Sequence, residues 1–471
     1  MSEQTFEMTA ADTNMYRLMR DAYYGDGGFR GPYLVPHKRE TEEDYRVRQK
    51  TAYYMNYFAP IVNALVDPIF KRTPLRDWSG AASTMVDAFV EDVDGAGNDI
   101  DTFMKLAALS AKLYGAVFIV VENYQAMDLP DNLADAVAQR KFPYAYTLDP
   151  DKVESYSIDK NGRVLAIKFR DTTVTSTMGK TVERTVYYDT KVWSIDENGH
   201  TVASGEHGLG VVPVIFFPSQ QIKNGELNPV PELYSVAGIA AALYNHCSWE
   251  TEIIRNQTFP VLTFPSKDAK DLVIGSNNAL CYDGDNIKNP PGYISPPSDP
   301  AEMIQSQIKL LIQEMYRQAG LSFINGQAAQ QTSGIARQWE FERTNQRLAT
   351  FAKRCAQTEK KMMQMFALWL GQELKYDVTY SSDFGITDVA TELANAQAVL
   401  DMGLTPELKV EVAKNVLTSY VPELDTNRFD EIIKAVEKAV KEPEYNEPPV
   451  PPASFQQQEP QQQEPEPPAK E

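Results

Sequence analysis

Hydrophobic positions recur at helical spacing through the N-terminal part of the chain. Glu42–Phe70 carries such a pattern, and Pro60 and Pro68 are expected to break it into two helices. Another helical pattern starts at Asp99 or Asp101 and leads into AVFIVVE, an apolar run of strand length. The Gly-rich stretch GDGGFRG at 25–31 follows no strand and lacks the Lys-Ser/Thr of a phosphate-binding loop, so we expect a flexible loop there.

The period of the pattern changes between residues 143 and 218. Apolar and polar residues alternate at Tyr144–Leu148 and again at Leu165–Phe169, which is typical of strands with one buried face. Asn161-Gly162 and Asn198-Gly199 are strong signals for tight hairpin turns. The sequence therefore predicts one antiparallel sheet, which ends in VVPVIFFP.

Two helical patterns then flank a compact insert. The first covers about Pro231–Gln257, and the insert, about Thr258–Pro297, contains the strand-like runs PVLTFP and LVIG. The second helix is expected to begin at Asp299, with Pro300 in its first turn, and to end at Gly320. A polar loop follows, LSFINGQAAQQTSG, and then a helical pattern over about 335–370, which would be over ~50 Å long at ~1.5 Å per residue.

The C-terminal part reads as a short strand and three compact helices. The strand lies in KYDVTYSSDFG, and the helices are expected to start near Thr387, Thr405-Pro406 and Asp425. From Glu442 the chain is mostly Pro, Gln and Glu, a composition that cannot bury a core and predicts disorder. The fold class is therefore α+β and predominantly helical, with a small antiparallel sheet.

Composition narrows the class of protein. The formal net charge is −20, whereas a conventional DNA-binding surface is basic, although an acidic chain could still belong to a protein that DNA passes without sticking. No apolar run reaches the ~20 residues that span a bilayer, and the N-terminus has no features of a signal peptide. Cys247, Cys281 and Cys355 are scattered, so we expect buried, reduced thiols.

No set of residues indicates catalysis or a cofactor. EDVDGAGNDID at 91–101 resembles a calcium loop only superficially, because Phe103 occupies the position where a carboxylate is needed, and an acidic turn that caps the next helix is the better interpretation. Four histidines lack metal-binding spacing, and no nucleophile, base and orienting group can be assigned. We therefore expect neither an enzyme nor a metal or cofactor site.

The order of elements resembles that of the portal proteins of tailed bacteriophages. Three stretches carry the likeness: residues 33–74, with YLVPHKRETEEDYRVRQK; residues 272–297, with LVIGSNNALCYDG; and residues 331–351, with QTSGIARQWEFERTNQ. The resemblance implies a wing at 1–228, stem helices at 229–257 and 299–320, a clip at 258–298, a tunnel loop at 321–334, a long helix returning to the wing at 335–385, a crown at 386–441 and a tail at 442–471.

The same resemblance implies a structural role in a virion. Portals form a ring, usually of twelve subunits, at one capsid vertex; double-stranded DNA passes through the ring, and the terminase motor, the head–tail adaptors and a major capsid or scaffold protein would be its partners. Two alternatives stay open: a capsid-associated morphogenesis enzyme, such as a nuclease or protease, and a non-phage scaffold protein. No membrane association is expected.

Three groups of residues are candidates for contacts. The tunnel loop offers uncharged groups that could exchange weak hydrogen bonds with DNA phosphates, or it could be an ordinary linker; they are Asn325, Gln327, Gln330, Gln331, Thr332 and Ser333. Arg337, Arg343 and Arg347 could line a channel, or could pair with Glu340 and Glu342 within or between subunits. In the clip, three lysines could face DNA or the motor, or could simply be solvated: Lys267, Lys270 and Lys288.

Overall fold

The structure is a computed structural model, and it falls into two compact units, Met1–Ile386 and Thr387–Glu471. It describes residues 4–25, 29, 31–38, 40–80, 83–124, 132–159, 163–171, 184–221, 229–258, 261–265, 279–282, 292–294, 299–321, 334–382, 384, 405–420 and 426–441.

The helices of the first unit are short near the N-terminus and long after residue 230. They are α1 Ala10–Tyr24, α2 Glu42–Thr51, α3 Phe58–Ala64, the 3-10 turn η1 Asp67–Phe70, α4 Ser83–Glu91, α5 Ile100–Tyr114, α6 Leu133–Ala138, the 3-10 turn η3 Pro150–Lys152, α7 Tyr234–Thr258, α8 Asp299–Ala319 and α9 Gly334–Leu370.

The described strands form four separate sheets. A six-stranded antiparallel sheet has the order β1-β5-β6-β7-β8-β9, from β1 Gln4–Glu7, β5 Val153–Ile158, β6 Val164–Asp171, β7 Arg184–Asp189, β8 Val192–Glu197 and β9 His200–Glu206. The others are β10-β3-β4, from β10 Val214–Pro218, β3 Ala116–Glu122 and β4 Tyr144–Leu148; β12-β11-β13, from β12 Ala279–Tyr282, β11 Val261–Pro265 and β13 Gly292–Ile294; and β14-β2, from β14 Leu374–Thr379 and β2 Leu75–Gly80.

Strand β3 lies between two hydrophobic cores because both of its faces are apolar. Val117, Ile119 and Val121 point into a core shared with α4, α5 and α9, whereas Phe118 and Val120 point into a second core against the six-stranded sheet. A third core joins α1, α3, α7 and α8. The α+β class predicted from the sequence is confirmed.

Several local predictions are also confirmed. The Asp99 side chain caps α5 by accepting from the Thr102 amide at 2.8 Å. Asn198 and Gly199 have φ of 52° and 82° in the turn between β8 and β9, which is the geometry that favours Asn-Gly. Gly320 ends α8 at φ 74°, and the Leu321 amide bonds back to the Tyr316 carbonyl at 2.8 Å.

Two expectations were wrong. VVPVIFFP does not end the large sheet: β10 pairs with β3 in the separate three-stranded sheet β10-β3-β4. The Glu42–Phe70 pattern breaks into three pieces, and Pro60 sits inside the first turn of α3, where its missing N–H costs no hydrogen bond. The flexible loop expected at 25–31 falls mostly outside the described residues; of that stretch, Phe29 is fully buried and stacks on Tyr33 and Tyr54.

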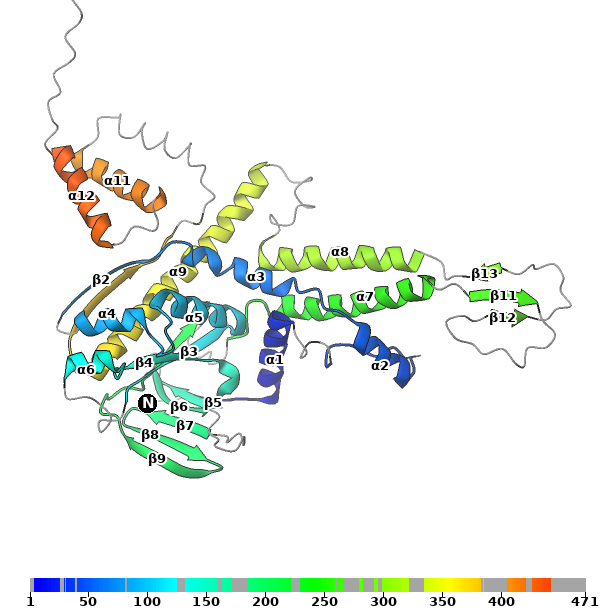
Figure 1. The fold of residues 1–471 in the computed structure, drawn as a ribbon, viewed down its shortest axis with the longest axis horizontal. Coiled ribbons are helices and arrows are strands. Elements are labelled where there is room, and N and C mark those ends of the chain that lie inside the picture. The colour runs from blue at the N-terminus through cyan, green and yellow to red at the C-terminus, as the bar shows by residue number, and fades with distance from the viewer. Residues whose placement is uncertain are drawn as a thin grey trace, which may run out of the picture. The chain divides into compact units, whose positions relative to one another are not determined.

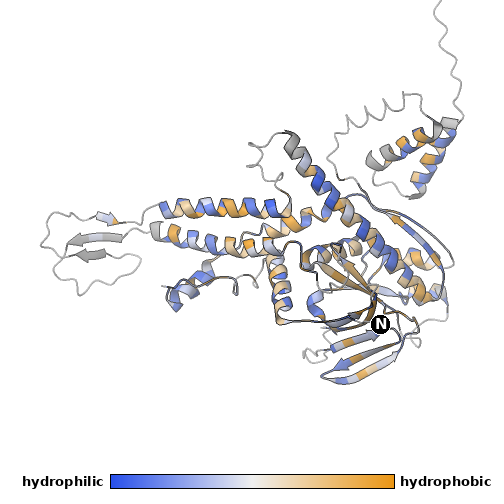
Figure 2. Cartoon of the chain, turned by 180° about the vertical axis from the view of Figure 1, so that it is seen from behind, coloured by the Kyte–Doolittle hydropathy of each residue, from blue (hydrophilic) through white to orange (hydrophobic). Residues whose placement is uncertain are grey.

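Helices α7 and α8 lie side by side and form a helical arm that leads away from the rest of the first unit (Figure 1). Hydrophobic and hydrophilic positions alternate along both helices (Figure 2), as expected where each helix buries one face against the other. Between them in sequence lies the small sheet of β11, β12 and β13.

In the second unit the structure describes two helices, which pack against each other. They are α11 Pro406–Tyr420 and α12 Thr426–Lys441. The predicted starts at Thr405-Pro406 and Asp425 agree with these bounds within a residue, while the start at Thr387 and the tail from Glu442 lie outside the described residues. Across the part of the chain that is described, no helix is long and apolar enough to cross a membrane.

Candidate functional site

The base of the helical arm is organised around one carboxylate, Glu232. It lies just before α7 and accepts from two cations, the Lys112 ammonium of α5 at 2.9 Å and the Arg347 guanidinium of α9. The side chains of Lys112, Glu232 and Arg347 are 6%, 19% and 30% exposed. These three residues, called here the base triad, join segments that are more than 100 residues apart.

Two residues of α9 also hold the end of α8, where the 322–333 loop begins. Arg347 donates to the Ala319 carbonyl at 2.8 Å, and Thr344 donates to the Gly320 carbonyl at 2.9 Å. Both carbonyls belong to the C-terminal end of α8, where helical carbonyls lack partners within the helix. The 322–333 loop therefore begins at a point that is fixed against residues 344–347 of α9. The loop's own residues lie outside the described part of the chain.

Charge balance explains why the base triad is stable. Burial lowers the pKa of Lys112, and the Glu232 charge opposes that shift. Burial alone would raise the pKa of Glu232, but the charges of Lys112 and Arg347 outweigh it and lower the pKa. The Lys112 ammonium also lies 4.5 Å from the centre of the Phe351 ring, a cation–π contact with α9.

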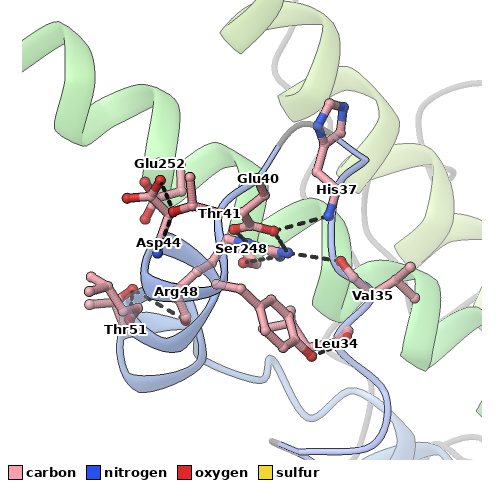
Figure 3. A network of polar contacts seen from close by, with 12 residues as sticks. Leu34, Val35, His37, Glu40, Thr41, Asp44, Arg48, Thr51, Ser248 and Glu252 are labelled. Atoms are coloured by element: carbon pink, nitrogen blue, oxygen red, sulfur yellow. Dashed lines mark hydrogen bonds and ion pairs between the residues drawn. The ribbon is translucent and has the colours of Figure 1, made fainter.

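A second polar network fastens the N-terminal segment to the helical arm (Figure 3). Arg48 of α2 makes a two-point ion pair with Glu40, at 2.6 and 2.7 Å, and also donates to the Ser248 hydroxyl of α7 at 3.1 Å. The Val35 carbonyl accepts from the same guanidinium at 2.8 Å. The hydrogen bonds from Arg48 lower the pKa of Glu40. These contacts hold residues 34–38 and 40–51 against one side of α7.

The C-terminal half of α9 is anchored by a buried carboxylate. Glu359 has no exposed surface, and it accepts from Arg76 of β2 at 2.7 Å and from the hydroxyls of Tyr376 and Tyr380 at 2.5 and 2.6 Å. A buried carboxylate with this many donors is held in one position. Helix α9 is therefore fixed twice, through Arg347 near the loop and through Glu359 at the β14-β2 sheet.

The residues predicted for contacts fall into two sets. Those of the tunnel loop and the clip lie outside the described residues: Asn325, Gln327, Gln330, Gln331, Thr332, Ser333, Lys267, Lys270 and Lys288. Arg337 lies in α9, but its side chain is also outside the description. Arg343 is exposed, with no ion-pair partner among the described residues, whereas Arg347 belongs to the base triad.

Sequence reasoning did not identify Lys112 and Glu232. One signal was available, because Lys112 occupies a position on the apolar stripe of α5 next to Ala108 and Ala111, and a buried lysine needs an opposite charge. Nothing in the local sequence singles out Glu232 as that partner.

The acidic stretch at 91–101 is a turn, as expected. Asp92 accepts from the amides of Gly95 and Gly97 and pairs with Arg140 at 2.7 Å, so its oxygens are already used. Among the described residues, no group of three or more His, Cys, Asp or Glu side chains could hold a metal ion. Cys247 and Cys355 are buried free thiols, as predicted.

Comparisons with known proteins do not assign this chain to a family. No protein-family model matches the sequence, and no curated protein matches it. One solved structure with a related chain path is the neck of an empty GTA particle computed with C6 symmetry; it is 10% identical, the match covers 87% of this chain and 95% of that one, and the TM-score is 0.46. So distant a likeness defines neither fold nor function.

Proposed function

We propose that this chain is one subunit of a phage portal, a ring at the capsid vertex through which the genome is packaged and ejected. The observation that carries the proposal is the order of elements around the helical arm. Two packed helices enclose a small sheet in sequence, and a polar loop then leads into a helix of 37 residues. Portals have this order of stem, clip, stem, tunnel loop and long helix.

In this proposal α7 and α8 are the stem, and β11, β12 and β13 belong to the clip. Residues 1–228 and 335–385 form the wing, and residues 386–441, with α11 and α12, form the crown. The 322–333 loop would contact passing DNA through its uncharged side chains, which offer weak hydrogen bonds without strong attraction. The contacts of Thr344 and Arg347 with the end of α8 support this assignment because they fix the point where the loop begins.

A ring of about twelve subunits requires a head-to-tail contact that closes on itself. The helical arm offers apolar groups for it: Tyr234, Trp249, Ile254, Met303 and Leu310 are 37–69% exposed. A stem helix packed between two neighbours would bury such groups. Terminase, head–tail adaptors and a capsid or scaffold protein would then dock on the ring, and the chain itself would have no enzymatic activity.

The first test is the assembly itself. Negative-stain images of the purified full chain should show rings with a central hole, and mass photometry should give a single species of about twelve subunits. Monomers that persist from low to high salt would refute the ring and favour a scaffold protein. Plasmid cleavage in magnesium that a point variant abolishes would favour an enzyme instead.

The second test concerns the loop. Replacing Gln330 and Gln331 with Glu adds two negative charges per subunit, which should repel DNA phosphates and reduce packaged DNA while the rings stay intact. The control is replacement of both residues with Asn, which keeps the amide groups and should package normally. Equal packaging by both variants would remove the loop from the mechanism.

A further inference from the structure

Helix α9 carries several cations in addition to the Arg347 of the base triad. Four of these cations have no ion-pair partner among the residues that the structure describes: Arg343, Lys353, Arg354 and Lys361. Lys360 adds a fifth charge, shared with Asp377 at 3.2 Å. These five residues are called here the α9 basic strip, and hydrophilic positions recur along this helix in Figure 2.

The α9 basic strip follows from helix geometry. At about 100° per residue, Arg343, Arg354 and Lys361 fall within about 20° of one another around the axis, and about 27 Å separates the first from the last. Lys353 and Lys360 lie about 80–120° away from these three around the axis, on another part of the exposed surface of α9. From residue 343 to 364 the only carboxylate is Glu359, which points to the opposite, buried side.

This charge distribution is unusual for the chain. The whole protein has a net charge of −20, so five cations on one helix do not reflect a generally basic surface. Two exposed carboxylates lie close to them, Asp377 beside Lys360 and Glu342 just before Arg343. Arg354 is half-buried, its Nε atom has no hydrogen-bond partner, and burial lowers its pKa. This Nε atom is itself inaccessible to solvent, so only the outer nitrogens of the Arg354 guanidinium could reach a ligand.

The neutral side chains of the strip identify the class of ligand. Gln346, Thr350, Gln357 and Gln364 are exposed between the cations and can donate hydrogen bonds. Among the described side chains from 341 to 367, no large hydrophobic residue is exposed; Trp339 and Leu368 lie beyond the strip. A protein partner would need an apolar centre, whereas a phosphate backbone needs only cations and hydrogen-bond donors.

We propose that the α9 basic strip binds the phosphodiester backbone of double-stranded DNA, independently of base sequence. The strip spans about eight base pairs at ~3.4 Å each. The proposal rests on the proposed function for its biological setting, and it adds a salt-sensitive contact to the uncharged contact of the loop. An acidic chain with one cationic strip would hold DNA at α9 and repel it elsewhere.

The test measures binding of the full chain to a fluorescein-labelled 30-base-pair duplex by anisotropy, from 50 to 200 mM salt. Four phosphate contacts predict an affinity that falls about 100-fold over this range. Replacing Arg343, Lys353, Arg354 and Lys361 with Gln should lower the salt slope by about 3–4. The control replaces four exposed lysines elsewhere with Gln, for the same change in net charge: Lys50, Lys71, Lys191 and Lys309.

The outcomes distinguish a failure of the DNA-binding proposal from a failure of the proposed ring. Loss of binding in the strip variant alone supports the proposal, whether the chain is a ring or a monomer. Equal loss in both variants would mean that net charge alone governs binding and would overturn it. Normal DNA binding with loss of self-association would show that the strip contacts a second copy, and it would also overturn the proposal.

Discussion

Removing the Glu232 carboxylate should loosen the base of the helical arm. Glu232→Gln leaves Lys112 buried without an opposite charge, and breaking a buried ion pair from one side costs about 3–5 kcal/mol. The contact with Arg347 adds little, because that side chain is 30% exposed and can turn to water. We therefore expect a loss of about 3–4 kcal/mol, concentrated where α5, the end of α8 and α9 meet.

Hydrogen–deuterium exchange read by peptide is the appropriate assay, because it reports local opening in a chain with two units. A loss of about 3–4 kcal/mol corresponds to exchange about 100- to 1,000-fold faster in peptides covering 100–114, 308–321 and 341–355, since each 1.4 kcal/mol is a factor of ten. The β7–β9 peptides should be unchanged because they make no contact with the base triad.

The matched control is Glu314→Gln. Glu314 also pairs with an arginine, Arg317, at 2.6 Å, but that arginine side chain is 68% exposed, so its loss should leave the exchange of these peptides almost unchanged. The double variant Glu232→Gln with Lys112→Met removes both buried charges and should recover most of the loss. If Glu232→Gln and Glu314→Gln exchange alike, the base triad does not hold the arm.

Four further outcomes are expected. The pKa of Glu232 is lowered from 4.5, so its contribution to stability is present above pH 4.5 and should be lost as the pH falls further, measured as an acid transition that Glu232→Gln lacks. Burial and the charge of Asp151 raise the pKa of Asp149, and its Oδ1 atom has no hydrogen-bond partner among the described residues. Asp149→Asn should therefore stabilise the fold by about 1 kcal/mol at pH 7 and by less at pH 4, as measured by thermal unfolding. Glu359→Ala should cost about 3–5 kcal/mol in the same assay, because it leaves the buried Arg76 with Asp101 as its one carboxylate partner and the Tyr376 and Tyr380 hydroxyls without their acceptor; a loss under 1 kcal/mol would contradict the anchor. Gly320→Ala should cost about 1–2 kcal/mol, since φ is 74° and a Cβ atom would meet the Arg347 guanidinium; unchanged stability would contradict this.

Features that depend on neighbouring residues were predictable from the sequence. The Asp99 cap, the Asn198-Gly199 turn and the Gly320 terminus each rest on the conformational preference of one or two residues. Helix α9 was predicted within a residue at its start, because its apolar positions recur over ten turns. Such signals do not depend on the rest of the fold.

Pairings between distant residues were not predictable. Strand β1 has the sequence QTFE, too short and polar to be recognised, and it forms a strand because β5, some 150 residues away, offers an edge. Likewise β2 pairs with β14 across almost 300 residues. The base triad belongs to the same class, because the position of Lys112 signals a partner but only the fold selects Glu232.

The two anchors of α9 determine what the helix can transmit. Arg347 and Glu359 are twelve residues apart, about 18 Å along the axis, and between them Phe351, Ala352 and Cys355 are buried. A displacement of α9 at Arg347 must therefore either break the Arg347 contacts or move the helix as a rigid body against its core. The first path is the weaker one, since Arg347 is 30% exposed while Glu359 is fully enclosed. Force on the 322–333 loop should thus open the base triad and leave the Glu359 anchor intact.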